Sequence, residues 1–323
     1  MKLLRQLRLN AKKKQRNFIF PESADERIIR ASKEIIKRKL GKVTLVTHAA
    51  DSIDLKPDKS LTIIDTRFSE QFLEKYSTLR RKKSNELNLD DLKIELSDPL
   101  TFGCMLLKSN YADGLIAGAV YPTSDVLRNG IRIIGLSNGN KTASSFFLFN
   151  FPAKHKYHDR IIAYADCGVI PFPDSKQLSD IAISTAKNYY RLTGKKPRVA
   201  FLSFSTKGSA YHERLETIFE AIKLTRRRAK SLVVDGELQF DAAFVPEVAT
   251  RKNSSGKIKG DANVFIFPDL NSGNIAYKIT ERIGGAIATG PIVQGLAKPI
   301  MDLSRGCSSD DIVNMFIIAS NLS

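Results

Sequence analysis

A short segment near the end of the sequence combines a hydroxyl group, a guanidinium group and a flexible residue, in Asp302-Leu303-Ser304-Arg305-Gly306. Glycines at positions 284, 285, 290 and 295 precede it, each beside an apolar residue. Glycine lets a backbone approach a ligand closely, and arginine donates charge-assisted hydrogen bonds to phosphate. We therefore predict a loop of small residues at which Ser304 and Arg305 meet a phosphate group.

Two carboxylates, Asp310 and Asp311, follow this segment closely. Acidic residues in the first turn of a helix interact favourably with the helix dipole. The apolar residues after them recur at helical spacing, at Ile312, Met315, Phe316 and Ile318. From the residues alone, the two carboxylates indicate the start of a helix.

A second candidate phosphate site is Ser205-Thr206-Lys207, which is followed by Gly208 and Ser209. It lies between an apolar strand pattern and a helix that we expect to begin near Tyr211. Backbone N–H groups between a strand and a helix can hold a phosphate, and the lysine adds charge. The alternative is a capped turn with a structural role only.

No metal site is predicted. Asp235, Glu237 and Asp241 place three carboxylates within a short stretch, but their spacing fits no standard metal-binding loop. His155 and His158 lie in a charged segment that is typical of a solvated loop. We therefore expect no tightly bound metal or cofactor.

The elements that position these residues follow an alternating pattern of strands and helices. Short apolar runs predict strands at 17–20, 42–47, 61–65, 113–119, 161–165, 199–204 and 262–267. We expect Asp25 to cap a helix between the first two strands, and Asp98-Pro99 to begin another helix. Asn271-Ser272-Gly273-Asn274 is interpreted as a turn before a helix over 275–283. Strands alternating with helices predict an α/β fold with parallel sheets.

Length and composition indicate a soluble protein of about two domains. The 323 residues are 42% hydrophobic and 26% charged, and no apolar run reaches the ~18 residues of a membrane span. Residues 1–16 lack the apolar core of a signal peptide, and we interpret them as an amphipathic helix rather than a transit peptide. Three cysteines without a C-x-x-C pair favour a reducing, cytoplasmic location.

The formal net charge of +17 favours partners that carry several negative charges. Nucleic acid and a small polyphosphorylated substrate both meet that description, and general lysine enrichment is a third explanation. The basic runs are scattered and have no interleaved aromatic residues, at Lys12–Lys14, Arg80–Lys83 and Arg226–Arg228. Their scatter argues against nucleic acid as a partner.

Several longer strings, taken together, are more specific than any one motif. They are PE-x-x-DER from Pro21, DP-x-x-FG from Asp98, ADG-x-x-AGA from Ala112, T-x-D-x-LR from Thr123, LSFSTKGS from Leu202, DGELQFDAA from Asp235, FPDLN from Phe267 and DLSRG from Asp302. In this order they resemble the phosphate acetyltransferase (phosphotransacetylase) family from about Phe18 onward. The sequence departs from the family pattern at residues 253–259, where we expect a surface loop.

The resemblance implies reversible transfer of an acetyl group between acetyl phosphate and coenzyme A, a substrate rather than a bound cofactor. By residue, it implies Asp311 as the base for the thiol, with Asp310 as the alternate. Ser304 would donate a hydrogen bond, and Arg305 and Arg128 would hold phosphate. Arg80 is the best match to a further family arginine, and the adjacent Arg81 leaves that register open. The role of Asp25 and Arg27 in PE-x-x-DER is interpreted as a capped, solvated helix start.

The resemblance also implies a two-domain parallel-sheet sandwich like that of the isocitrate and isopropylmalate dehydrogenases. The domains would be 1–140 with 300–323 and 141–299, with the active site in the cleft between them, and the protein would be a homodimer. A phosphate butyryltransferase is the nearest alternative, although DGELQFDAA and FPDLN favour acetyl. A metal- and NAD-dependent decarboxylating dehydrogenase and a nucleic-acid-binding protein are alternatives from other classes.

Overall fold

The computed structural model describes residues 2–48, 55–81 and 88–323, and the side chains of Lys2 and Arg81 are outside that description. The chain divides into two compact units. The N-terminal unit comprises Lys2–Ser137 and Leu296–Ser323, and the central unit comprises Asn138–Gly295.

The N-terminal unit is built on a five-stranded sheet whose described strands are all parallel. The strand order is β11 (Ile300–Asp302), β4 (Gly114–Ala117), β1 (Asn17–Phe20), β2 (Lys42–Thr47) and β3 (Leu61–Asp65). Parallel strands need crossover connections, and α2 (Glu26–Lys37) makes the one from β1 to β2. Because all five strands end at the same edge, the segments that follow β4 and β11 lie side by side.

The described part of this unit has nine helical segments, two of which begin at polar caps that the sequence identifies. They are α1 (Lys2–Lys14), α2 (Glu26–Lys37), η1 (Thr66–Phe72), α3 (Leu73–Arg81), α4 (Leu89–Ser97), α5 (Pro99–Lys108), α6 (Thr123–Asn129), η2 (Gly130–Ile134) and α12 (Ser309–Leu322). Asp25 accepts a hydrogen bond from the Arg27 N–H at the start of α2, and Asp98 accepts one from Thr101 before α5. Both caps confirm the sequence prediction.

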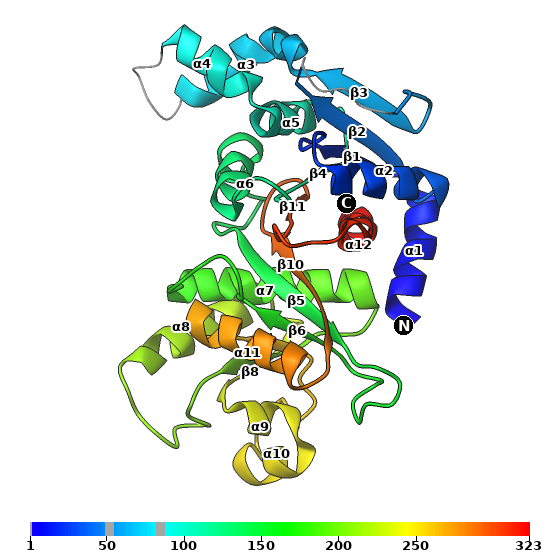
Figure 1. Ribbon diagram of the computed structural model, residues 1–323. Coiled ribbons are helices and arrows are strands. Elements are labelled where there is room, and N and C mark those ends of the chain that lie inside the picture. Colours follow the sequence, from blue (N-terminus) through cyan, green and yellow to red (C-terminus); the bar gives the residue numbers. More distant parts are fainter. Residues whose placement is uncertain (1, 49–54, 82–87) are drawn as a thin grey trace. The chain divides into compact units, whose positions relative to one another are not determined.

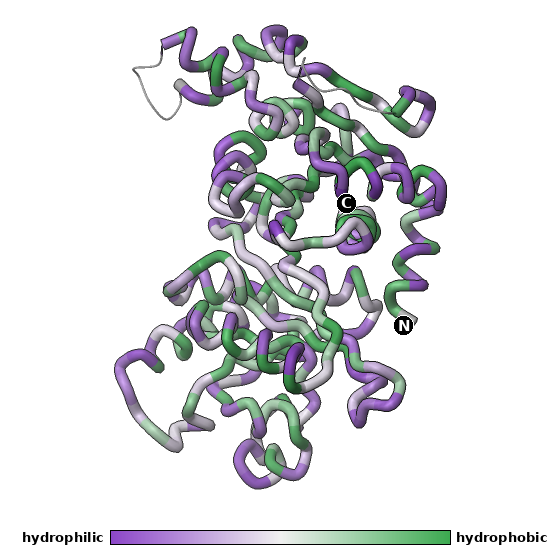
Figure 2. The backbone as a smooth tube through the Cα atoms, in the orientation of Figure 1, coloured by the Kyte–Doolittle hydropathy of each residue, from purple (hydrophilic) through white to green (hydrophobic). Residues whose placement is uncertain are grey.

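Two apolar layers cover the faces of this sheet. On one side, Phe18 and Phe316 meet edge to face at 5.2 Å, which packs α12 on β1. In Figure 1 the red helix α12 lies beside the blue helices α1 and α2. Figure 2 shows hydrophobic and hydrophilic residues alternating along α1, whose Leu7 and Ala11 are buried. The other face is covered by α5, of which residues 100–107 are buried throughout.

The central unit contains a six-stranded mixed sheet, so the expectation of a parallel sheet is confirmed only in part here. Its order is β10 (Ile287–Gln294), β5 (Ser144–Asn150), β6 (Ile161–Ala165), β9 (Val264–Ile266), β7 (Arg198–Leu202) and β8 (Val233–Leu238). Strand β5 is antiparallel to both of its neighbours, and the remaining pairs are parallel. The connection from β5 to β6 has no helix, so the chain returns as an antiparallel hairpin.

The helices of the central unit pack against this sheet (Figure 1). They are α7 (Ser175–Thr193), α8 (Arg214–Arg228), α9 (Phe240–Phe244), α10 (Pro246–Lys252) and α11 (Leu270–Arg282). Buried aromatic residues dominate the core, where Tyr164 meets Phe149, Phe265 and Phe267 at 4.7 to 5.6 Å.

The segment 271–274 is helical, so the predicted turn there is wrong. Asp269 caps α11 by accepting from the Ser272 N–H, and the helix runs from Leu270 to Arg282. Gly273 has a packing role: a Cβ atom at this position would lie 2.2 Å from the carbonyl oxygen of Asp166. The glycine permits close approach of two backbones rather than a change of chain direction.

The predicted loop of small residues before Ser304 is also wrong over much of its length. Residues 287–294 form β10, which lies at the edge of the sheet. Its register shifts between Thr289 and Ile292, around Gly290 and Pro291. Proline is tolerated at sheet edges and bulges because it cannot donate to the ladder, and Gly290 adopts a φ of +155° beside the Phe147 ring.

No helix in the described part of the chain is long and apolar enough to cross a membrane.

Candidate active site

Ser304 and Arg305 lie directly after β11, at the carboxyl edge of the N-terminal unit's parallel sheet. Ligands of open α/β sheets bind at this edge. The backbone reverses in a turn in which the Cys307 N–H donates to the Ser304 carbonyl at 2.9 Å. The Gly306 N–H lies 3.3 Å from Ser304 Oγ. Both the Ser304 and Arg305 side chains are exposed, so they are available to a ligand.

The side chain of Arg27, in the first turn of α2, donates hydrogen bonds to the backbone of this turn. Its Nη1 donates to the carbonyl oxygens of Arg305 at 2.7 Å and Cys307 at 3.0 Å. Its Nη2 donates to the Ala119 carbonyl at 2.8 Å and to Asp25 Oδ2 at 2.7 Å. The interpretation of Arg27 as a solvated helix-start residue is therefore wrong, although Asp25 does cap the helix.

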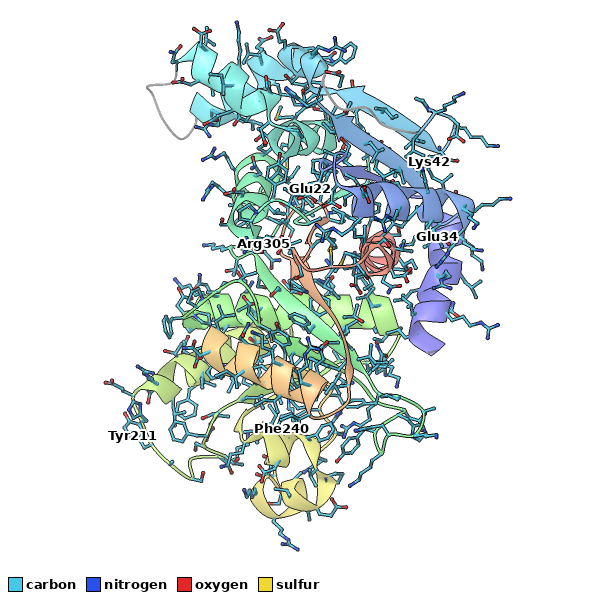
Figure 3. The ribbon with its side chains drawn as sticks, viewed as in Figure 1. Glu22, Glu34, Lys42, Tyr211, Phe240 and Arg305 are labelled. Carbon is cyan, nitrogen blue, oxygen red and sulfur yellow. The ribbon has the colours of Figure 1, made fainter. Side chains whose placement is uncertain are left out.

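Glu22 fixes the neighbouring turn after β4. Its buried carboxylate accepts four backbone N–H groups, from Gly118, Ala119, Val120 and Tyr121, at 2.8 to 3.0 Å. Successive N–H groups that point into one concavity form an anion-binding nest, and here the protein's own carboxylate occupies it. Figure 3 labels Glu22 and Arg305 in this region of the unit.

Asp302, the last residue of β11, is a buried carboxylate that lies two residues before Ser304. Its Oδ2 accepts a hydrogen bond from Thr123 Oγ1 at 2.7 Å, which connects the turn to the start of α6. Its Oδ1 is buried without a hydrogen-bond partner among the described residues. Burial raises the pKa of Asp302 from its usual 3.8 to about 6, despite the hydrogen bond from Thr123, and the nearby Glu22 adds to the rise.

Asp311 caps α12. Its Oδ2 accepts from the Ser308 N–H at 2.9 Å and from Ser308 Oγ at 2.8 Å, while the Asp311 N–H donates to Ser308 Oγ at 3.2 Å. This is a reciprocal capping box, and the carboxylate is exposed. The helix-start interpretation of the two acids is therefore confirmed for Asp311. Asp311 lies six residues after Arg305 in the sequence.

Cys307 lies between Arg305 and Asp311 and is buried. Burial raises the pKa of its thiol, while the charge of Arg27 lowers it and that of Asp311 raises it further. A thiol with a raised pKa holds little thiolate at neutral pH and reacts slowly. The site therefore does not present Cys307 as an activated nucleophile.

Arg128 lies on α6, the helix that Thr123 connects to Asp302. Its side chain is 58% exposed and pairs with Asp125 at 2.6 Å. An exposed ion pair of this kind contributes little to stability, which leaves the guanidinium accessible to an anion.

Arg80 lies against other charged groups of the same unit. Its side chain is 14% exposed, with Nη1 3.1 Å from Glu95 Oε2 and the guanidinium over the Tyr76 ring at 5.9 Å. The Tyr76 hydroxyl also donates to Glu95, at 2.7 Å. The alternative, Arg81, has a side chain outside the described part of the chain.

The other predicted phosphate site, Ser205-Thr206-Lys207, belongs to the central unit. Ser205 Oγ and the Gly208 N–H donate to Glu237 Oε1 at 2.9 and 2.7 Å. Lys207 Nζ donates to Asp235 Oδ1 at 2.5 Å. The carboxylates of Asp235 and Glu237 thus accept hydrogen bonds from the groups that a phosphate would need as donors. This geometry favours the alternative, a capped turn with a structural role only. Binding of substrate by these three residues stays a prediction.

Glu22, Arg27 and Asp302 are the site residues that sequence reasoning missed. The string PE-x-x-DER contains Glu22 and Arg27, and a helix cap at Asp25 requires neither of them. Their presence was therefore a signal that could have been used. Asp302 gave no such signal, because its burial depends on the pairing of β11 with β4. Among the described residues, no cluster of three His, Cys, Asp or Glu could hold a metal ion.

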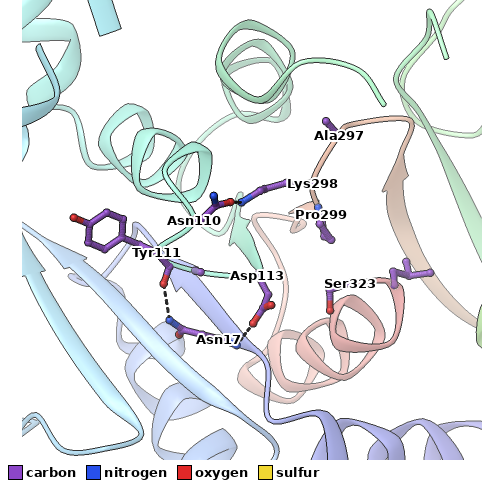
Figure 4. Close-up of a pocket in the computed structure, with 10 residues that line it drawn as sticks. Asn17, Asn110, Tyr111, Asp113, Ala297, Lys298, Pro299 and Ser323 are labelled. Carbon is purple, nitrogen blue, oxygen red and sulfur yellow. Dashed lines mark hydrogen bonds between the residues drawn. The ribbon is translucent and has the colours of Figure 1, made fainter. Parts of the chain in front are cut away.

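The opposite edge of the same sheet has a cavity of about 440 Å³, where β1, β4 and β11 begin. Figure 4 shows Asn17, Asp113 and Lys298 around it. Lys298 Nζ donates to the Leu107 carbonyl at 2.7 Å and to Asn110 Oδ1 at 2.5 Å. The Lys298 ammonium group is therefore hydrogen-bonded within the protein. The cavity lies at the other edge of the sheet and contributes no hydrogen-bond donor to the Ser304 turn.

The model of the family described as "Phosphate acetyl/butaryl transferase" matches residues 2–320 of this chain. A phosphate acetyltransferase of Acetivibrio thermocellus is 42% identical over 324 residues, covering 99% of this chain and 98% of that protein. One of Thermoanaerobacterium thermosaccharolyticum is 38% identical and covers 98% and 97%. The crystal structure of a phosphotransacetylase from Streptococcus pyogenes superposes with a TM-score of 0.91, at 35% identity, covering 99% and 98%.

Fold and site thus define an α/β transferase with an exposed Ser-Arg turn at the carboxyl edge of a parallel sheet. The chain belongs to the phosphate acetyl/butaryl transferase family, which confirms the resemblance stated from the motifs.

Proposed function

We propose that this protein is a phosphate acetyltransferase that moves an acetyl group reversibly between acetyl phosphate and coenzyme A. The observation that carries the proposal is the exposed Ser304–Arg305 turn at the carboxyl edge of the sheet, directly followed by the Asp311 carboxylate. A hydroxyl, a guanidinium and a carboxylate on one short segment match the three demands of the reaction. These are an oxyanion donor, a phosphate ligand and a base for the thiol.

In the forward direction, Asp311 takes the proton of the coenzyme A thiol, and the thiolate attacks the carbonyl carbon of acetyl phosphate. The C–S bond forms, and the tetrahedral oxyanion accepts a hydrogen bond from Ser304. The C–O bond to phosphate then breaks, phosphate leaves with the electron pair, and Arg305 and Arg128 stabilise its charge. The proton on Asp311 passes to phosphate or solvent.

A carboxylate that is free in water is a far weaker base than a thiolate. Bound substrate changes that balance in two ways. It excludes water from Asp311, and the phosphate charge disfavours the ionised carboxylate. The base function of Asp311 is therefore a property of the substrate complex.

The acetyl group is the proposed acyl group, because DGELQFDAA and FPDLN are present and the cited relatives are named phosphate acetyltransferases. Butyryl remains the second candidate, since the family model covers both activities. A decarboxylating dehydrogenase or a nucleic-acid-binding protein would need different sites. We further propose a homodimer in the cytoplasm and a fold related to the isocitrate and isopropylmalate dehydrogenases.

The test is a thioester assay with purified protein, coenzyme A and either acetyl or butyryl phosphate. We expect acetyl phosphate to give the higher kcat/KM and a metal chelator to leave the rate unchanged. Arg305→Ala should lower kcat/KM for the acyl phosphate severely, about 10²-fold or more, because a charge-assisted phosphate contact is lost. A preference for butyryl phosphate would reassign the substrate, and inhibition by the chelator would favour the dehydrogenase alternative.

A further inference from the structure

We propose that Arg27 is a positioning residue for acetyl transfer, because its guanidinium sets the backbone of the turn that carries Ser304 and Arg305. The inference rests on the proposed function. It assigns a role to the one basic residue of the PE-x-x-DER string, whose part in the chemistry is otherwise unexplained.

The hydrogen bonds of Arg27 use every N–H group that a guanidinium has. Nε donates to Asp25 Oδ1 at 3.0 Å, Nη1 donates to Arg305 and Cys307, and Nη2 donates to Asp25 and Ala119. A guanidinium has five N–H donors in a fixed planar fork. With all five engaged inside the protein, Arg27 has none left for a substrate phosphate. It therefore acts on the turn and not on the ligand.

Arg27 connects the turn to the backbone of Ala119, which is itself held in place. The Ala119 carbonyl accepts from Arg27, and the Ala119 N–H donates to the buried Glu22 carboxylate at 3.0 Å. Both sides of this residue's backbone are thus held. Asp25 completes the anchor, since the bidentate contact with Arg27 lowers its pKa and keeps it ionised.

The turn needs such an anchor because Ser304, Arg305 and Gly306 are exposed. An exposed segment with a glycine has little packing to fix its backbone, and a displacement of about 1 Å in a reacting group can cost ~10²-fold in rate. Two of the Arg27 contacts are to main-chain carbonyls of the turn, so they position the turn whatever side chains it carries.

The test compares Arg27→Met and Arg27→Lys with Arg30→Met on the same helix α2. Arg30 is exposed and pairs only with Glu26 in its own helix among the contacts of the described residues, which makes it a matched control. We expect Arg27→Met to lower kcat by about 10- to 100-fold with KM values for both substrates within about threefold of the wild type. Arg27→Lys should recover only part of the loss, because a lysine has three donors and no planar fork.

Two further measurements separate positioning from folding. Arg27→Ala should regain activity when guanidinium is added at millimolar concentration, whereas a chain that is merely destabilised would lose activity further. Asp25→Asn keeps the helix cap but removes the charge that holds the fork, so it should lower kcat by a smaller factor. This variant provides the test if Arg27→Met does not fold.

Three results would overturn the inference. A raised KM for an acyl phosphate with unchanged kcat would make Arg27 a substrate ligand. Normal kcat with a lowered melting temperature would make it a purely structural residue, as would loss of activity without guanidinium rescue. An inactive wild-type protein in the same assay would instead remove the proposed function on which the inference rests.

Discussion

Asp311 combines two roles that a single substitution can separate. Its carboxylate closes the capping box of α12 with Ser308, and the proposed mechanism requires the same group as a base. An asparagine retains an acceptor oxygen for the cap but cannot take a proton. The structure thus offers a variant that removes the chemistry and keeps the helix.

We predict that Asp311→Asn lowers kcat by about 10²-fold or more while the KM for coenzyme A changes little. Raising the pH should partly restore the rate, because more of the coenzyme A is then thiolate without help. Asp310→Asn is the control, since a first-turn acid contributes only ~0.3–1 kcal/mol. Steady-state kinetics and circular dichroism of both variants provide the measurement. A crippled Asp310→Asn beside a normal Asp311→Asn would move the base by one residue.

Asp302 gives a pH dependence of stability whose sign follows from its burial. Its pKa is raised to about 6 in the folded protein, so between pH 4 and 6 the folded chain holds a proton that the unfolded chain has lost. The stabilising contribution is therefore present below pH 4 and is lost as the pH rises through 6. At pH 7 the buried charge costs about 1 to 3 kcal/mol.

Asp302→Asn should remove this dependence. We expect the free energy of unfolding of the variant to gain on that of the wild type as the pH rises from 5 to 8, measured by urea denaturation at each pH. The acceptor for Thr123 is retained in asparagine, so the comparison isolates the titration. A difference that is constant over this pH range would mean that Asp302 does not titrate there.

At the scale of elements, packing decides the result where local sequence signals mislead. Gly273 lies within helix α11, in a stretch that looks like a turn. Replacing a helical glycine by alanine ordinarily gains up to ~1 kcal/mol. Here the new Cβ would meet the Asp166 carbonyl at 2.2 Å, which is backbone and cannot move aside.

We therefore predict that Gly273→Ala destabilises the protein, by about 1 to 3 kcal/mol, despite its better helix propensity. Lys278→Ala, on the exposed side of the same helix, should stay within ~0.5 kcal/mol of the wild type. Thermal unfolding of the two variants decides the matter. A stabilised Gly273→Ala would show that α11 can shift away from the Asp166 strand end.

The elements that the sequence predicts well are those with a local cause. The strands at 17–20, 42–47 and 61–65 are found with the predicted bounds, because short apolar runs between turns need no distant information. Strand β10 was missed because its glycine and proline are tolerated only at a sheet edge beside β5, and that pairing is not local.

The same distinction applies to the site. Ser304, Arg305 and Asp311 could be named because they are close in sequence. Arg27 contacts Arg305 across 278 positions, and Glu22 binds a turn 96 to 99 positions away, so only the fold brings these groups together.

At the scale of the whole molecule, the proposed homodimer has a candidate surface in the central unit. Ile275, Ile279 and Ile283 follow one face of α11 and its end, and all three are exposed, by 58%, 51% and 83%. Ile287 at the start of the edge strand β10 is 38% exposed. A contiguous apolar stripe beside an unpaired edge is typical of an interface, and Lys278 and Glu281 beside it give a second copy opposite charges to meet.

We predict that Ile279→Lys shifts the protein toward monomers, because a charge at the centre of such an interface is desolvated without a partner. Light scattering after size-exclusion chromatography measures the mass. Ile94→Lys is the control, since Ile94 is 72% exposed on α4 of the other unit. Dimers that persist in Ile279→Lys but dissociate in Ile94→Lys would place the interface elsewhere.

Direct transfer from acetyl phosphate to coenzyme A is the central claim, and one measurement tests it most directly. Phosphate release from acetyl phosphate is followed with the wild-type protein, first without and then with coenzyme A. The account predicts no enzyme-dependent release before coenzyme A is added, and afterwards one phosphate for each thioester formed. A burst of phosphate in the absence of coenzyme A, matched by acetyl bound to the protein, would contradict direct transfer. Absence of thioester from a folded protein would contradict the proposed function itself.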